Sequence, residues 1–252
     1  MNEINENAKI GKNCKFGTNV IIGPNVSIGD NNTFGNNVVI TGNVLVGNNN
    51  YFSDFISIGR PTQHRTKKFE FKEQQLGTIK IGHDNILREF VTIHSPVNTS
   101  TILENNCFLM AYVHIPHDAH ISEDVTLVNN CQIGGHTFIG KSSYLALSCT
   151  VHPRTTIGAF CRIGMHSTIN SDIPPGMISH GSPIRSKDVD VKFMKEKGFS
   201  DLEIDEIKIF YKNNVTKDDL LKNSSDLSST IFKNHIQDFL NRSTRRISFP
   251  SL

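Results

Sequence analysis

The sequence has little excess charge and no long apolar run. It contains 26 lysines and arginines against 24 aspartates and glutamates, so the formal net charge is only +2. That balance does not give the broad positive field by which proteins attract nucleic acids, and we expect no nucleic-acid partner. No apolar stretch approaches the ~20 residues that a membrane-spanning helix needs, so we expect no transmembrane segment.

A secretory signal is also missing. The N-terminal segment, MNEINENAKI, has neither the basic start nor the apolar centre of a signal peptide. We therefore expect a cytoplasmic protein. Its five cysteines should then be reduced thiols rather than disulfides.

What the sequence does contain is a six-residue repeat, in which a large apolar residue stands at every sixth position. The first run comprises Ile10, Phe16, Ile22, Ile28, Phe34, Ile40, Val46, Phe52 and Ile58, most of them followed by glycine. The second run comprises Leu109, Ile115, Ile121, Leu127, Ile133, Ile139, Leu145, Val151, Ile157, Ile163 and Ile169. Between the runs the step is kept by Ile81, Leu87 and Ile93.

A period of six fits neither an α-helix nor a plain β-strand, whose side chains repeat over shorter periods. It is typical of a coil with three short straight faces, each pointing one apolar side chain inward. Stacked coils pair their strands at ~4.8 Å and bury a continuous apolar column. The pattern resembles the hexapeptide repeat of the left-handed parallel β-helix proteins, and the left hand is implied by that resemblance alone. We therefore expect a mainly β fold.

A second inward position lies two residues before each large apolar residue and has room only for small side chains. The second run has Cys107, Val113, Ala119, Val125, Cys131, Thr137, Ser143, Cys149, Thr155, Cys161 and Ser167 there, and Cys14 occupies the same slot in the first run. All five cysteines thus fall at such positions, and free cysteine is often simply buried. We expect them to fill the core rather than to form disulfides, bind a metal or act as nucleophiles.

Two interruptions break the repeat. Residues 60–78 form an insertion whose early basic residues are Arg60, Arg65, Lys67 and Lys68. This segment is either a solvated loop or an arm that reaches a neighbouring subunit or an anionic ligand. A second, shorter excursion near residues 95–101 is less informative.

The repeat ends after Ile169, because the segment Ile173-Pro174-Pro175-Gly176 is a turn that no strand would continue through. From about residue 187, apolar residues recur at helical spacing in VKFMKEKGF, SDLEIDEIKIFYKNN and STIFKNHIQDFLNRSTRR. Ser200 and Glu203 predict a capping box at the start of the second of these helices. We expect a β-helix domain over residues 1–186 and a C-terminal helical domain over residues 187–252.

Several of the eleven histidines cluster in the later coils. Three faces of six residues make one coil, so residues eighteen apart should stack. That spacing puts His117 in a row with Gly135 and Pro153, which leaves room for a ligand beside the imidazole. The adjacent row contains Asp118, His136 and Arg154. Surface histidines and a metal site, as in a γ-class carbonic anhydrase, remain open at this point, as does a structural β-helix, although a purely structural coil needs no such cluster.

At these residues the chain resembles the acyl-carrier-protein-dependent UDP-N-acetylglucosamine O-acyltransferases of lipid A synthesis, over almost its whole length. The motifs that carry the resemblance are Arg88-Glu89 with VTIH, His114-Ile115-Pro116-His117-Asp118, Gly135-His136, Val151-His152, Asp172-Ile173-Pro174-Pro175, Lys197-Gly198-Phe199-Ser200 and Arg242-Ser243-Thr244-Arg245. The order of the histidine motifs and of the terminal Arg-Ser-Thr-Arg is the specific part, because a hexapeptide repeat alone is shared by many proteins.

The resemblance implies a role for each catalytic residue. His117 would be the general base, since the pKa of imidazole lies near operating pH. Asp118 would orient that histidine, and the Gly135 N–H would bind the oxyanion. The substrate-positioning residues would be His114, His136 and His152. The resemblance further implies a homotrimer with the site between subunits, a donor carried on the phosphopantetheine of acyl carrier protein, a nucleotide-sugar acceptor, and no metal or other cofactor.

The chain departs from the family at the substrate contacts. Gln63 and Lys67 lie where the family has a Gln-Asp-x-Lys pattern, and the aspartate is absent. Asp190 replaces an asparagine that contacts the nucleotide, and Glu196-Lys197 replaces a pair of arginines. We expect substrate contacts from Gln63, Lys67, Asp190 and Lys197, with altered nucleotide-sugar recognition. N-acylation of another nucleotide-linked amino sugar from acyl-coenzyme A, for surface polysaccharide, therefore stays open as the alternative.

The resemblance also implies which residue limits the length of the acyl chain. Counted from His152 without a gap, Met165 stands where long-chain members of the family have a glycine at the floor of the acyl groove. A methionine side chain would fill part of that groove, so we expect a preference for shorter donors. The alternative is that Met165 packs against a neighbouring subunit.

Overall fold

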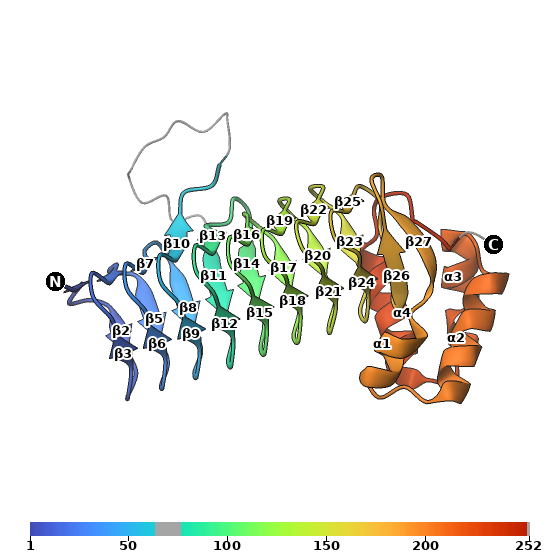
Figure 1. Ribbon diagram of the computed structural model, residues 1–252, viewed down its shortest axis with the longest axis horizontal. Helices are drawn as coiled ribbons and strands as arrows, with labels where there is room; N and C mark the ends of the chain where they lie inside the picture. The colour runs from blue at the N-terminus through green and yellow to red at the C-terminus, as the bar shows by residue number, and fades with distance from the viewer. Residues whose placement is uncertain (64–76, 251–252) are drawn as a thin grey trace.

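The computed structural model describes residues 1–63 and 77–250 of the chain, and Lys67 with most of the insertion lies outside this range. Figure 1 shows a long column of stacked coils with α-helices at its C-terminal end. No helix in the described residues has the length and apolarity that crossing a membrane requires.

Three sheets run along the column. The first contains β1 (Glu3–Ile4), β4 (Ile21–Ile22), β7 (Val39–Ile40), β10 (Ser57–Arg60), β13 (Thr92–His94), β16 (His114–Ile115), β19 (Gln132–Ile133), β22 (Thr150–Val151) and β25 (Thr168–Ile169). The second contains β2 (Lys9–Ile10), β5 (Val26–Ile28), β8 (Val44–Val46), β11 (Thr78–Ile81), β14 (Ser100–Leu103), β17 (His120–Ile121), β20 (Phe138–Ile139) and β23 (Thr156–Ile157). The third contains β3 (Lys15–Phe16), β6 (Thr33–Phe34), β9 (Tyr51–Phe52), β12 (Ile86–Leu87), β15 (Phe108–Leu109), β18 (Thr126–Leu127), β21 (Tyr144–Leu145) and β24 (Arg162–Ile163), and ends in β26 (Met177–His180) and β27 (Arg185–Val189).

Each strand of the coils pairs in parallel with its counterpart one coil further along. Leu109 pairs with Leu127, and Leu127 pairs with Leu145. This register equals the coil length that the six-residue repeat predicts. The expected parallel β-helix with C-terminal helices is therefore confirmed.

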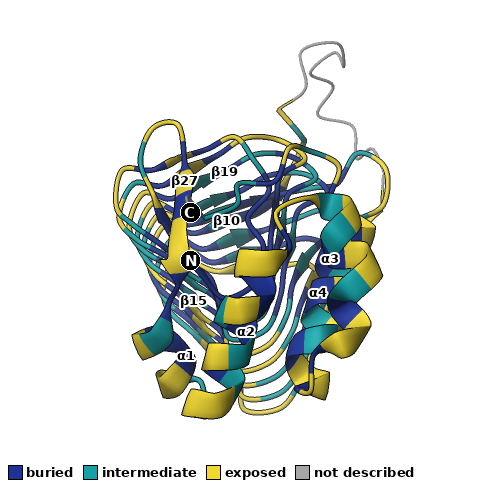
Figure 2. Ribbon diagram, turned by 90° about the vertical axis from the view of Figure 1, so that its right-hand side faces the viewer, coloured by how far each residue is buried: buried dark blue, intermediate teal, exposed yellow. Residues whose placement is uncertain are grey.

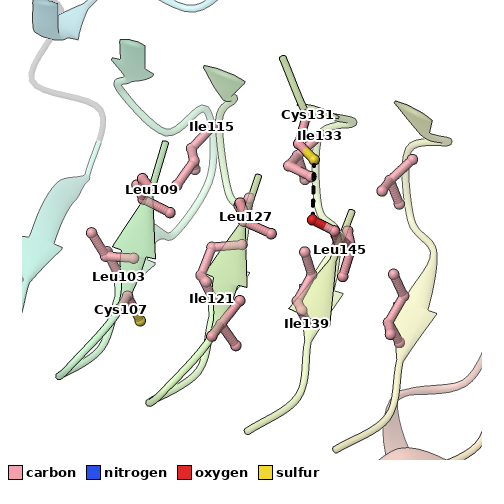
Figure 3. Packing of buried hydrophobic residues seen from close by; sticks show 14 of the residues in the cluster. Leu103, Cys107, Leu109, Ile115, Ile121, Leu127, Cys131, Ile133, Ile139 and Leu145 are labelled. Atoms are coloured by element: carbon pink, nitrogen blue, oxygen red, sulfur yellow. Dashed lines mark hydrogen bonds between the residues drawn. The ribbon is translucent and has the colours of Figure 1, made fainter. Parts of the chain in front are cut away.

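The apolar repeat residues fill the interior of the column. Figure 3 shows three inward rows of side chains, one from each sheet, with Leu109, Leu127 and Leu145 in one of them. Each of these leucines is fully buried. Burial of one such side chain contributes ~1.5–3 kcal/mol, so the column as a whole supplies most of the driving force for folding.

The cysteines are core residues, as predicted. All five are free thiols; four are buried, and Cys14, in the first coil, is partly buried. Burial raises the pKa of Cys107 and of Cys161 to about 12. A thiol that stays protonated is a poor nucleophile and a poor metal ligand, which agrees with a packing role.

Asparagine and glycine have different tasks in the turns. Asn13, Asn31 and Asn49 take the left-handed conformation, with φ between 58° and 61°. Their side-chain amides bond from coil to coil, Asn13 Nδ2 to Asn31 Oδ1 at 3.2 Å and Asn31 Nδ2 to Asn49 Oδ1 at 3.3 Å. Gly11, by contrast, is needed because a Cβ there would lie 2.4 Å from the carbonyl carbon of Gly29 in the next coil.

The end of the column differs from the sequence prediction. The strand β26 still pairs in parallel with β24, with Ile163 opposite Ser179. It then forms an antiparallel hairpin with β27. The repeat pattern ends after Ile169, but the third sheet continues, because hairpin pairing needs no six-residue period.

The helical region contains α1 (Val191–Glu196), α2 (Asp201–Asn213), α3 (Lys217–Asn223), the 3-10 helix η1 (Ser224–Asp226) and α4 (Thr230–Arg242). The capping box of Ser200 and Glu203 is present at the start of α2. Sequence reasoning missed the short α3, whose one buried residue is Leu220. Figure 2 shows these helices at the end of the column, each with one buried and one exposed side. Tyr211 donates a hydrogen bond to the Pro175 carbonyl at 2.8 Å and so ties α2 to the last coil.

Candidate active site

His117 and Asp118 lie in the turn between β16 and β17, at the corner between the first and second sheets. His117 Nδ1 lies 2.9 Å from Asp118 Oδ2. Because an ionised carboxylate can only accept hydrogen bonds, Nδ1 must carry the proton. In the neutral imidazole this leaves Nε2 as the unprotonated nitrogen, through which the ring can act as a base.

Asp118 is held by backbone groups of residues 97–99. The N–H of Val97 donates to Oδ2, and those of Asn98 and Thr99 donate to Oδ1, at 2.8 to 3.0 Å. Burial opposes ionisation of the carboxyl group, but the donors from Thr99, His117 and Val97 together hold the pKa of Asp118 below its usual value. The excursion near residues 95–101 is thus the support of this carboxylate.

Gly135 faces the imidazole from the next coil. A Cβ on Gly135 would lie 2.6 Å from Cε1 and 2.7 Å from Nε2 of His117. The Gly135 carbonyl accepts a hydrogen bond from the Arg154 N–H at 2.8 Å, one coil further along. The predicted stacking of residues eighteen apart at this corner is confirmed. Only glycine leaves the imidazole in its place.

His136 completes a group of three around the same point. Its ring packs edge-on against His117 with centroids 5.1 Å apart, and its Nε2 lies 3.9 Å from Asp118 Oδ2. Burial is the main cause that lowers the pKa of His136, which favours the neutral ring. The candidate ligand atoms of these three residues lie within 4.8 Å of one another, a spacing that a metal ion could use. A metal would have to compete with the N–H groups that already bind both oxygens of Asp118.

Two further histidines lie near this group. His114 is in β16, three residues before His117, and His94 ends β13 on the preceding coil. His114 Nδ1 is 2.8 Å from Thr92 Oγ1, and the rings of His94 and His114 pack edge-on at 4.8 Å. Burial, with the nearby His114 and His117, lowers the pKa of His94 to about 4. His94 closes the VTIH motif, yet sequence reasoning gave it no role. Its position directly behind His114 makes it a residue of the site.

His152 lies further along the same corner and is exposed. Its Nδ1 is 2.7 Å from Arg245 Nη2, and Arg245 Nε donates to the Pro153 carbonyl at 3.2 Å. Arg245 ends the Arg-Ser-Thr-Arg motif, to which sequence reasoning gave no function. The contact brings the last segment of the chain to the histidine corner, the corner between the first and second sheets that carries His117, Gly135 and His152.

The predicted substrate contacts Asp190 and Lys197 are engaged within the protein. The buried Asp190 carboxylate caps α1 through the Phe193 N–H and pairs with Arg162. Lys197 Nζ lies 2.6 Å from Asp124 Oδ2. Asp190 therefore has a structural task that leaves it no free face for a nucleotide, whereas the partly exposed Lys197 could exchange its partner for a phosphate.

Gln63 lies at the same corner as His117, two coils before it, whereas Met165 lies at another corner of the single chain. Gln63 is exposed at the start of the insertion. Met165 is 65% exposed and lies between β24 and β25, at the corner between the third and first sheets. His117 is at a different corner, so within one subunit Met165 cannot line a groove that starts at His117.

Known proteins resemble this chain in sequence and in fold. A family model described as bacterial transferase hexapeptide (six repeats) matches residues 7–42. The acyl-[acyl-carrier-protein]–UDP-N-acetylglucosamine O-acyltransferase of Pseudomonas putida (strain W619) is 37% identical over 232 residues, 89% of this chain and 88% of the relative. That of Pseudomonas putida (strain GB-1) is 38% identical over 226 residues, 87% of this chain and 86% of the relative.

The chain belongs to the acyl-[acyl-carrier-protein]–UDP-N-acetylglucosamine O-acyltransferase family. Solved structures agree with this assignment. LpxA from Acinetobacter baumannii superposes with a TM-score of 0.89 at 26% identity, covering 98% of this chain and 97% of that one. The UDP-N-acetylglucosamine acyltransferase LpxA of Bacteroides fragilis gives 0.80 at 28% identity, with the same coverage. The family likeness thus extends over the coils and the C-terminal helices together.

Proposed function

We propose that this protein transfers an acyl group from acyl carrier protein to UDP-N-acetylglucosamine, an O-acylation step of lipid A synthesis. The relatives named above are acyltransferases of this type. The observation that carries the proposal is the His117–Asp118 pair at 2.9 Å, with Gly135 leaving the imidazole accessible. No step of this chemistry needs a metal or a cofactor of the protein's own.

The geometry supports a general-base mechanism. His117 Nε2 takes the proton of the acceptor hydroxyl while that oxygen attacks the thioester carbonyl. The carbonyl oxygen becomes an oxyanion, to which the Gly135 N–H donates. Collapse of the tetrahedral intermediate breaks the C–S bond, and the thiolate takes the proton from the imidazolium. Asp118 keeps Nδ1 protonated and stabilises the transient positive charge.

The remaining parts of the proposal concern assembly and substrate contacts. We assign the positioning of substrates to His114, His136 and His152, with Gln63, Lys67 and Lys197 as further contacts. Within one subunit, Met165 cannot reach a groove at His117. A second subunit would have to bring the corner that carries Met165 to His117. We therefore propose a homotrimer in the cytoplasm with the site between subunits. Sedimentation equilibrium at micromolar concentration checks the trimer, and a monomer there would contradict it.

The test is a matrix of two donors and two acceptors with the purified protein. Acyl carrier protein thioesters and acyl-coenzyme A are each offered with UDP-N-acetylglucosamine and with a UDP-linked amino sugar that carries a free amine. We expect turnover with the carrier-protein donor and UDP-N-acetylglucosamine. Turnover only with acyl-coenzyme A and the amine would establish N-acylation instead.

His117→Ala should lower kcat by ~10²–10⁴, the usual contribution of a general base. The exposed His180 lies outside the cluster, and His180→Ala serves as the matched control. A His117→Ala variant that keeps more than about a tenth of wild-type activity would contradict the assigned role.

A further inference from the structure

A large basic cavity lies at the C-terminal end of the histidine corner. Its volume is about 760 Å³, and its lining includes four basic side chains from three separate segments, Arg185, Lys217, Arg245 and Arg246. No acidic side chain is among the described lining residues, and none of the four basic residues forms an ion pair within residues 1–63 and 77–250. Like charges gathered around a hollow repel one another, and an anion inside it would relieve that repulsion.

The cavity wall is held in place by a buried carboxylate. Asp172 is fully buried and accepts hydrogen bonds from the Arg245 N–H at 2.9 Å and the Ser243 hydroxyl at 2.8 Å. The Asp172 N–H donates to the Arg246 carbonyl, and the Ser248 N–H donates to the Asp172 carbonyl. These bonds fix the segment that carries Arg245 and Arg246, so both guanidinium groups extend from a rigid backbone.

The cavity shares its corner with His117. Gly135 stacks on the His117 ring, and His152 and Pro153 lie one coil beyond Gly135, where Arg245 contacts both. Two coil steps of ~4.8 Å separate the His117 and Pro153 positions by ~10 Å, and the Arg245 guanidinium contacts Pro153. A substrate could therefore present its reacting group to His117 and an anionic group to the cavity at the same time.

We propose that this cavity binds a phosphate group of a substrate whose reacting end lies at His117. Planar guanidinium groups match phosphate oxygens with paired, charge-assisted hydrogen bonds. The proposal rests on the proposed function for the identity of the substrates, which offer two sources of that chemistry. One is the phosphate ester of a phosphopantetheine arm, and the other is the diphosphate of a nucleotide sugar.

The test measures binding rather than turnover, by calorimetry on the full chain. The probes are 4′-phosphopantetheine and UDP, each beside its phosphate-free counterpart, pantetheine or uridine. Arg185 and Arg246 are exposed, so the double variant Arg185→Gln with Arg246→Gln removes two charges at little risk to the fold. The matched control removes two exposed lysines of the first coils, by Lys9→Gln with Lys15→Gln.

We expect the double variant to weaken binding of at least one phosphorylated probe about tenfold or more, because each lost bond to a charged group is a strong one. Weakening of 4′-phosphopantetheine places the donor in the cavity, and weakening of UDP places the acceptor there. The variant Arg185→Lys with Arg246→Lys should restore most of the affinity. Unchanged binding of both probes, or equal weakening in the lysine control or with pantetheine and uridine, overturns the proposal.

The outcome is separable from the fate of the proposed function. A wild-type protein that binds a phosphorylated probe through Arg185 and Arg246, yet transfers no acyl group, would refute the proposed function and support phosphate binding in the cavity. A protein that transfers acyl groups normally, but whose double variant loses no affinity for either probe, would refute phosphate binding in the cavity and leave the proposed function standing.

Discussion

Single residues at the histidine corner are constrained by the space that the next coil leaves them. Gly135 is the sharpest case, because any side chain there meets the imidazole of His117. We predict that Gly135→Ala displaces the imidazole and lowers kcat ~10²-fold, the usual cost of a misplacement of about 1 Å, while the coils stay folded. Gly23→Ala is the control, since its Cβ would meet nothing closer than 3.3 Å. Activity within a factor of two of wild type in Gly135→Ala would show that the ring has room to move.

Met165 carries the prediction on acyl length. Its exposed side chain can limit an acyl groove only where a neighbouring subunit closes that groove. Each methylene that fails to bury forfeits ~0.8 kcal/mol, so long donors should be poor substrates of the wild type. We expect Met165→Gly to shift the preferred donor to longer chains in a series of acyl lengths. An unchanged preference would assign Met165 to packing between subunits.

At the scale of elements, the turn after β16 and the segment 95–101 depend on each other. Asp118 accepts three backbone N–H groups from this segment, and it also orients His117. We predict that Asp118→Asn lowers kcat and also speeds amide hydrogen exchange at residues 97–99, because an amide cannot accept all of these bonds. Asp124→Asn, in the next turn of the same coil, serves as the control for exchange. Lowered activity with unchanged exchange would show that Asp118 orients His117 but does not hold residues 97–99 in place.

How much of these elements the sequence predicts depends on the range of the contacts involved. The rows of Leu109 and of His117 with Gly135 follow from a strict period, so their stacking is predictable. The segment 95–101 carries no pattern of its own, and its task appears only once Asp118 is placed beside it. Asp190 was expected to contact substrate, but its partner Arg162 lies 28 residues away, and no periodicity relates the two. The short helix α3 buries little apolar surface and so leaves only a faint helical signal.

For the molecule as a whole, several histidines couple stability to pH. Burial lowers the pKa of His94 to about 4 and also lowers that of His114, His136 and His235. Between the usual pKa of 6.5 and these lowered values, the unfolded chain binds protons that the folded chain does not. Stability should therefore be highest above about pH 6.5 and fall as the pH drops toward 4. The lowered pKa of Asp118 has the same sign, but its effect begins only at more acidic pH.

The expected observation is a melting temperature that decreases steadily from pH 7 to pH 5. The variant His94→Gln should show a shallower decrease, because it removes the most strongly shifted of the four groups. A melting temperature that is flat or rises over this interval would contradict the burial of these rings as neutral groups.

The coil register has a consequence for how such a site can change. Positions along the histidine corner are available only at whole coil steps of ~4.8 Å, because each turn repeats the one before it. Moving a functional group by less than a step must come from the length of its side chain, as between glycine and methionine. Moving it by more requires inserting or deleting an entire turn of the column. The backbone thus sets the distances that substrates must span in whole coil steps, and side chains adjust these distances by smaller amounts. Substrate specificity can therefore change gradually without disturbing the coils.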